Sequence, residues 1–223
     1  MANFNVHLSA GIIGGTALAH IGWGMGVWPG ESLFLVIMLT TIGGLLPDID
    51  AHNSHSVKLI FNLFALITMV FVSTLLHGSY SFWMIALISA CVFVGVRYGV
   101  SNAFLMLTEH RGNCHSLVAM LLAGFVTAAG SYSLQQNGIT AWSHGFAVML
   151  GVLIHLVLDE IYAVDFAGVR LKKSFGTGVK VLSLEHPFSA VGFVVLAFIM
   201  AGLAPPMSDA MTLISYIWGQ TWH

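Results

Sequence analysis

Long apolar stretches separated by short polar connections run along the whole chain. A membrane-spanning helix needs about 20 apolar residues, within a range of about 17–25. Candidate spans lie at 6–27, 32–47, 57–76, 81–107, 115–134, 143–162, 187–205 and 208–222. The second and the last are short, so tilted, re-entrant or interfacial helices are alternatives there. The pattern predicts an all-α, polytopic membrane helix bundle of about seven to eight helices.

The composition supports a membrane protein. The chain is 57% hydrophobic and only 7% charged, whereas soluble domains carry roughly 25% charged residues. Its 223 residues predict one membrane-embedded domain, 1–223, with membrane lipids as partners. The net charge of -2 offers no basic surface for nucleic acid, and the pattern leaves the oligomeric state open. No Lys or Arg precedes the first apolar stretch, so we expect it to remain in the mature protein.

Basic residues predict the orientation of the bundle. With alternating spans, the connections near 47–57, 108–115 and 163–186 share one side with both termini. That side holds Lys58, Arg111, Arg170, Lys172, Lys173 and Lys180, and Arg97 lies within the fourth span toward it. The opposite connections contain no Lys or Arg. By the positive-inside rule the basic side is cytoplasmic.

The polar clusters of the chain all fall on this predicted cytoplasmic side, and they consist of metal-ligand residue types. They are His7, the segment 46–50 (LPDID), the segment 109–116 (EHRGNCHS) and the segment 155–159 (HLVLD). Ionisable groups near hydrocarbon are costly, so they indicate a functional site. His155 and Asp159 are four residues apart and share one helix face, where they could hold one cation. The alternative for this pair is a buried His–Asp hydrogen bond.

Two carboxylates follow a helix break at Pro47. Asp48 and Asp50 flank Ile49, and their mutual repulsion would be relieved by a bound cation. A solvated turn with two ordinary acids is the alternative.

A second polar turn lies between the fourth and fifth spans. His110 and His115 bracket Arg-Gly-Asn-Cys, in which Gly112 and Asn113 suit a turn. Both imidazoles could point into one pocket, or they could be interfacial histidines. Ser116 is expected to N-cap the next helix, unless His115 already sits in its first turn.

Cationic residues beside these clusters are candidates for substrate binding. Arg111 could clamp a phosphate with its guanidinium, or it could only anchor the turn at the interface. Arg170, Lys172 and Lys173 in the long loop could hold a phosphate or contact anionic lipid heads.

The clusters together supply seven donors on one side. They are His7, Asp48, Asp50, His110, His115, His155 and Asp159. Seven ligands exceed one tetrahedral site and suit two adjacent ions, as in two-metal phosphoesterases. The expected cofactor is a divalent metal, two zinc ions, with manganese or iron as alternatives. His20, His77 and His144 are expected to lie near the opposite side, outside the site. The two cysteines imply no disulfide framework, and Cys91 is expected to be buried.

The motifs LPDID, HRGNCHS, HLVLDE and GVRLKKSFGTGVKV resemble bacterial inner-membrane metal-dependent hydrolases of the YdjM type, from His7 to about Pro187. Family members often carry His directly after the second Asp, where this chain has Ala51 followed by His52. They also often carry Thr where this chain has Cys114. The resemblance implies a bacterial inner-membrane location, hydrolase activity and the seven metal ligands named above, without naming a substrate.

These observations predict hydrolysis of a phospholipid or another lipid-linked phosphoester at the cytoplasmic interface. A metal-activated water would attack, and Asp50 or Glu109 could take its proton. A fainter analogy to soluble zinc phospholipase C and nuclease P1 also favours phosphodiesters. The alternative is a divalent-metal transporter or sensor with the same ligands. An intramembrane peptidase is disfavoured because the chain has no HEXXH motif.

Overall fold

The computed structural model describes residues 3–50, 55–107, 113–165, 170–171, 180–183 and 187–220. It is all-α apart from one pair of two-residue strands. Two compact units emerge from its internal contacts: Met1–Pro47 with Gly112–His223 (unit 1) and Asp48–Arg111 (unit 2). The single-domain prediction stays a prediction.

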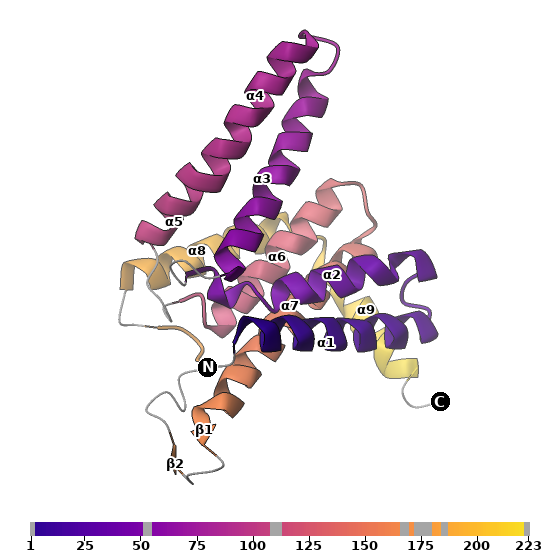
Figure 1. The fold of residues 1–223 in the computed structure, drawn as a ribbon. Helices are drawn as coiled ribbons and strands as arrows, with labels where there is room; N and C mark the ends of the chain where they lie inside the picture. The colour runs from indigo at the N-terminus through magenta and orange to yellow at the C-terminus, as the bar shows by residue number, and fades with distance from the viewer. Residues whose placement is uncertain are drawn as a thin grey trace. The chain divides into compact units, whose positions relative to one another are not determined.

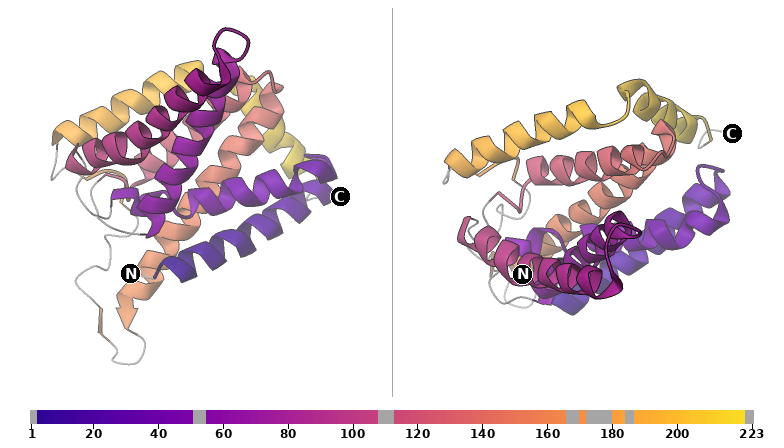
Figure 2. Two further views of the ribbon diagram at one scale, coloured as in Figure 1. Left: turned by 45° about the horizontal axis from the view of Figure 1, so that its top comes forward. Right: turned by 90° about the horizontal axis from the view of Figure 1, so that it is seen from above.

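Unit 1 is a set of helices around α7, in which α1 and α6 run antiparallel to α7 and α2 runs parallel to it (Figure 1). Its elements are α1 (Phe4–Gly24), η1 (Gly30–Ser32), α2 (Leu33–Gly43), α6 (Leu117–Ser133), α7 (Gly138–Ala163), α8 (Pro187–Leu203) and α9 (Met207–Gln220). Helix α6 lies between α7 and α8, whereas α1 and α2 pack on α7 from its other side (Figure 2). Strands β1 (Val164–Asp165) and β2 (Arg170–Leu171) pair antiparallel directly after α7. Because α1 and α2 run in opposite directions, and α6 and α7 do as well, the chain returns repeatedly to the same end of α7.

Glycines allow α2 and α7 to pack so closely that the backbone of one helix contacts the backbone of the other. A Cβ atom added to Gly151 of α7 would overlap the Thr40 carbonyl oxygen of α2. A Cβ added to Gly43 of α2 would likewise overlap the Val148 carbonyl oxygen of α7. Small residues at such crossings permit the close helix contacts that membrane helices depend on. The contact matters for the site because the C-terminal end of α2 is thereby held against α7.

The polar turn before α6 forms the predicted helix cap. Ser116 has an extended backbone and its hydroxyl accepts the Ala119 N–H at 3.1 Å. Ser116 is therefore the N-cap of α6, as the sequence predicts, and His115 stands just outside the helix.

Unit 2 is a helical hairpin. It contains α3 (His55–Leu76), α4 (Phe82–Val94), the π-helix η3 (Gly95–Val100) and α5 (Ser101–Leu107). The Ser73 and Ser89 hydroxyls hydrogen-bond across α3 and α4 at 2.7 Å, while the Phe61 and Phe104 rings meet at 5.8 Å. Cys91 is exposed on α4. The expectation that it would be buried is wrong, because an apolar helix in a two-helix hairpin has few neighbours to cover it.

Fewer helices than the eight apolar stretches have the length and composition of a full span. Within the described residues these are α3, the continuous helix Phe82–Leu105 and α7. Helices α8 and α9 qualify only as a pair, bent by 84° between Leu203 and Met207, which would make a fourth span. Helices α2 and α6 are apolar but short. Hydropathy located the helices but misjudged some ends: α2 ends at Gly43, before the predicted 47, and α7 begins at Gly138, before the predicted 143. Hydropathy does not register where a helix bends or ends.

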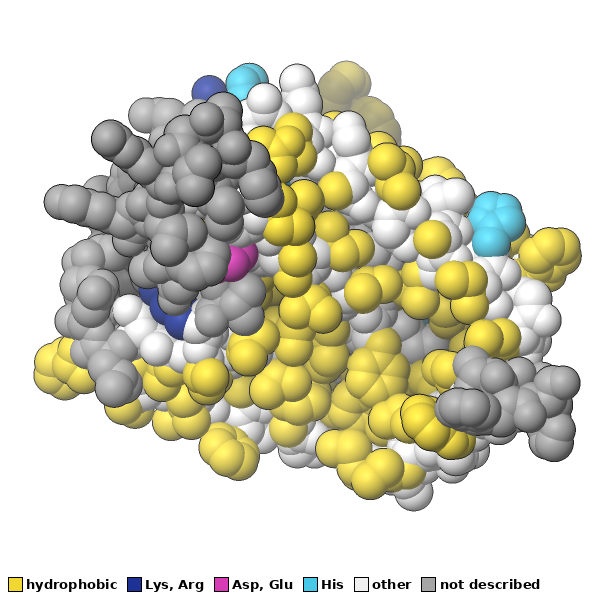
Figure 3. Space-filling view, turned by 90° about the horizontal axis from the view of Figure 1, so that it is seen from below, with side chains coloured by type: hydrophobic (Ala, Val, Ile, Leu, Met, Phe, Trp, Pro, Cys, Tyr) yellow, Lys and Arg dark blue, Asp and Glu magenta, His cyan; other side chains and the backbone are white. Residues whose placement is uncertain are grey.

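Hydrophobic side chains cover much of the outer surface. Ile13, Phe34, Leu134, Phe188 and Phe198 are each 69% or more exposed, and the face shown in Figure 3 is predominantly apolar. Such extensive apolar exposure, uncommon on soluble monomers, fits helices that face lipid.

Candidate metal centre

Four ionisable side chains from three parts of the chain meet inside unit 1. His7 lies in the first turn of α1, His115 directly precedes the N-cap of α6, and His155 and Asp159 lie toward the end of α7. Each residue is at most 2% exposed. The antiparallel arrangement brings these ends together, as the clustering of polar residues on one predicted side anticipates.

The three imidazoles present Nε2 to the single carboxylate of Asp159. His7 Nε2 is 3.4 Å from Oδ1, whereas the Nε2 atoms of His115 and His155 are 3.8 and 3.9 Å from Oδ2. These separations exceed the roughly 2.7–3.2 Å of an N–H···O hydrogen bond. Two ligand atoms bound at about 2.0–2.2 Å to one tetrahedral ion would lie about 3.3–3.6 Å apart. The His7 separation falls within this range and the other two lie just above it. The spacing is therefore closer to joint ligation than to the hydrogen-bonded His155–Asp159 pair of the alternative interpretation.

A backbone hydrogen bond fixes the tautomer of His155. Its Nδ1 lies 2.8 Å from the Gly44 carbonyl oxygen, and a carbonyl oxygen only accepts, so Nδ1 carries the hydrogen. In the neutral ring, Nε2 then carries the lone pair and faces Asp159. Metal-ligating histidines almost always donate their other ring N–H in this way.

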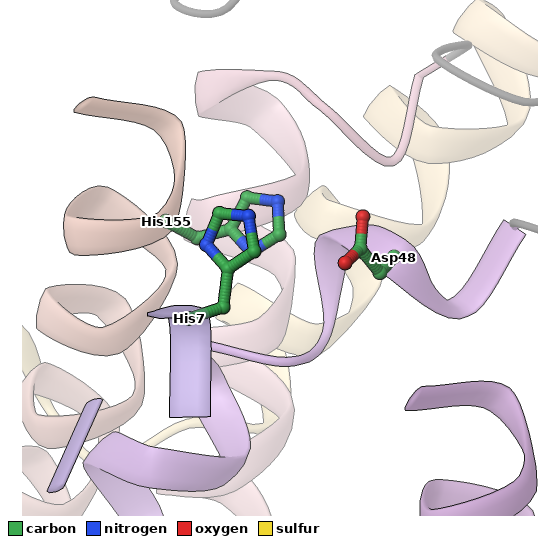
Figure 4. A group of neighbouring side chains, drawn as sticks. All are labelled: His7, Asp48 and His155. Carbon is green, nitrogen blue, oxygen red and sulfur yellow. The ribbon is translucent and has the colours of Figure 1, made fainter. Parts of the chain in front are cut away.

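Stacking of His7 on His155 disfavours a positive charge on both of these rings at once. The two rings are nearly parallel, 12° apart, with centroids separated by 3.7 Å (Figure 4). Two positive charges at that separation would repel by about 4 kcal/mol at an effective dielectric constant of about 20. Desolvation of both buried cations would add to this. A neutral imidazole, by contrast, is the form that binds a metal.

The burial of both ring nitrogens of His7 also favours a bound cation. Within the described residues, neither ring nitrogen of His7 has a hydrogen-bond partner, and both are inaccessible to solvent. Burial of polar atoms without hydrogen bonds is unfavourable, and coordination of a cation would offset it. The residues present therefore fit a divalent ion.

One group of donors within unit 1 has the spacing of a metal site. The donor atoms of His115, His155 and Asp159, all buried, lie within 4.8 Å of one another. Asp48 lies in the 3-10 helix η2 (Pro47–Asp50) and is the first residue of unit 2. The candidate metal centre consists of four residues of unit 1: His7, His115, His155 and Asp159.

Other predicted site residues are not brought into this centre by the described structure. Glu109, His110, Arg111, Lys172 and Lys173 lie outside the described residues, and so do the side chains of Asp50 and Arg170. His20, His77 and His144 belong to no donor group of the described residues, and their place near the opposite side stays a prediction. Sequence reasoning missed the Gly44 carbonyl, because no residue type marks a backbone acceptor.

The fold and the cluster define a polytopic helical membrane protein with a buried His/Asp group that could bind metal. The model of the YdjM inner membrane protein family matches residues 1–182, and the chain belongs to this family. The matched range contains all four residues of the centre. No curated protein and no solved structure matches the chain.

Proposed function

We propose that this protein is a membrane-bound metal-dependent hydrolase that cleaves a phospholipid or another lipid-linked phosphoester. The observation that carries the proposal is the convergence of three buried imidazoles on the Asp159 carboxylate. His115, His155 and Asp159 supply three protein ligands, the number typical of catalytic zinc sites, which keep a further position for water or substrate.

Two ions are favoured over one by the way Asp159 is shared. Its Oδ1 faces His7, whereas its Oδ2 faces His115 and His155. His7 and Asp159 would hold one ion, and His115, His155 and Asp159 would hold the other, as in two-metal hydrolytic sites. Zinc is the first choice because imidazole dominates the donor set, and manganese or iron is the alternative because carboxylates broaden selectivity.

Divalent ions at this centre would supply Lewis-acid chemistry, activating water and stabilising charge that develops on a phosphoryl oxygen. The protein would supply the remaining roles from its sequence motifs. Asp50 or Glu109 would accept the proton of the attacking water. Arg111, together with Arg170, Lys172 and Lys173, would hold the phosphate.

A lipid-linked substrate fits the setting of the centre. The ligands lie near helix ends in a protein whose outer surface is strongly apolar. A substrate whose acyl chains remain in the bilayer could present its phosphate to ligands that lie near the ends of the helices. The charge asymmetry of the connections supports a cytoplasmic position for this end under the positive-inside rule.

Metal transport or sensing is the alternative function. Transporter sites lie near the bilayer midplane at broken helices. Here His7 and His115 lie at helix beginnings, which favours an interfacial enzyme.

Elemental analysis of the purified protein, combined with a lipid-hydrolysis screen read by mass spectrometry, tests the proposal. Wild type and His144→Ala should hold metal and release product, whereas His155→Ala should do neither. Metal binding without hydrolysis of any lipid phosphoester would favour the transporter or sensor, and absence of metal would overturn both.

A further inference from the structure

Asn113 joins three segments around the turn that carries His115. Its Oδ1 accepts the Ser183 N–H at 2.9 Å, and its Nδ2 donates to the Ser189 hydroxyl at 3.2 Å. Asn113 is 3% exposed. The side chain thus ties the turn before α6 both to the segment 180–183, near the end of the long loop 163–186, and to the first turn of α8.

The segment 180–183 is also attached to the beginning of α6 through the backbone. Leu117 N–H donates to the Lys180 carbonyl oxygen at 2.9 Å, and Ser116 and Lys180 form a parallel β-bridge. The Ser116 hydroxyl in turn donates to the Asn113 carbonyl oxygen at 2.6 Å. Hydrogen bonds therefore hold the chain on both sides of His115, at Asn113 before it and at the N-cap residue Ser116 after it.

His115, unlike the other two histidines, depends on hydrogen bonds outside a helix to fix its backbone. His7 and His155 are held within helices α1 and α7, whereas His115 stands outside a helix and gains no support from a helical hydrogen-bond ladder. Ligand geometry in metal sites depends on outer hydrogen bonds that restrict the ligand. The Asn113 amide supplies such restriction through both of its polar ends.

We infer that Asn113 is a positioning residue for His115, and that its bonds to Ser183 and Ser189 couple the segment 180–183 and the first turn of α8 to the metal centre. The inference rests on the proposed metal centre. Asn113 does not itself supply a ligand in this inference. It restricts the turn so that His115 Nε2 stays directed at the Asp159 carboxylate.

The test is a double-mutant cycle on zinc affinity in the full-length protein. Asn113→Ala should weaken zinc binding about tenfold, at the lower end of the roughly 10–100-fold range for outer-shell changes. In a His115→Ala background the same substitution should have little further effect, because the residue it positions is gone. Ser189→Ala removes only one of the two Asn113 side-chain hydrogen bonds, so it should weaken zinc binding less. This variant replaces Asn113→Ala in the test if Asn113→Ala does not fold.

A matched control comes from the other end of the same helix pair. The Ser131 hydroxyl bonds His144 Nδ1 at 2.8 Å between α6 and α7, about 16 Å along α7 from His155. Ser131→Ala should leave zinc affinity unchanged. The visible absorption of the cobalt-substituted protein should change with Asn113→Ala and not with Ser131→Ala, because only the former disturbs ligand geometry.

The outcomes separate this inference from the proposed function. Wild-type protein that binds no zinc would remove the metal centre itself. Wild-type binding combined with an unchanged affinity in Asn113→Ala, or with effects that add fully to those of His115→Ala, would leave the centre standing and overturn the role of Asn113.

Discussion

His155 donates its Nδ1 hydrogen to the carbonyl oxygen of Gly44 across 2.8 Å, joining two residues 111 positions apart. The bond directs the lone pair of Nε2 toward Asp159, and it exists because α2 and α7 meet at backbone distance. The orientation of a candidate ligand on α7 is therefore set by the end of α2.

Removal of the ligands on α7 should remove metal. We expect purified protein to hold about two divalent ions, and we expect His155→Ala and Asp159→Asn each to lose metal and hydrolysis together. His77→Ala and His144→Ala should retain both, because neither residue belongs to a donor group. Inductively coupled plasma mass spectrometry measures the ions. Equal losses in all four variants would mean that structural histidines have been mistaken for ligands.

Chelation should lower thermal stability. A ligand that binds only the folded state stabilises it by about 2.7 kcal/mol at a concentration 100 times its Kd. Treatment with a chelator should therefore lower the Tm of the wild-type protein in detergent, and added zinc should restore it. The Tm of Asp159→Asn should respond to neither treatment. A wild-type Tm indifferent to chelator and zinc would contradict a buried centre.

The contact between α2 and α7 should be sensitive to one methyl group. Gly151→Ala places a Cβ against the Thr40 carbonyl oxygen, and overpacking of this kind destabilises by about 1–3 kcal/mol. Metal affinity should fall as well, because the Gly44 carbonyl would shift relative to His155. Gly130→Ala on α6 is the control, since nothing lies within 4 Å of its added Cβ. Thermal unfolding and zinc titration of both variants measure the difference.

The basic connections should face the cytoplasm. Single cysteines introduced at positions 111 and 172, in protein lacking Cys91 and Cys114, should resist a membrane-impermeant reagent added from the periplasm. They should react once the membrane is opened. Periplasmic labelling at position 111 would reverse the proposed orientation of the centre.

Substitution of Arg111 should separate substrate binding from metal binding. Arg111→Lys keeps the charge but loses the bidentate fork, so turnover should fall roughly tenfold to a hundredfold, matching a loss of about 1.5–3 kcal/mol. Metal content should stay near the wild-type value, and Arg111→Ala should be more severely impaired. Loss of metal in Arg111→Lys would instead assign Arg111 to support of the ligands.

The sequence by itself determined the class of the protein and the most local part of its centre. Apolar runs locate the helices because burial in lipid selects hydrophobic residues over many consecutive positions. The pair His155 and Asp159 was predictable because helical periodicity alone puts residues four apart on one face. Ser116 was identified as a cap for the same reason, since capping depends on a few adjacent residues.

Tertiary structure alone decided how the donors meet and how each is oriented. His7 and His115 reach Asp159 only because helices separated in sequence pack antiparallel around α7. The choice of Nε2 on His155 depends on a Gly44 carbonyl, and backbone acceptors leave no trace in residue types. The Asn113 side chain likewise hydrogen-bonds to residues that lie 70 and 76 positions further along the chain. Hydropathy and local spacing record which residues favour the membrane or a helix face, whereas hydrogen-bond partners across the fold depend on packing distances that only the three-dimensional arrangement sets.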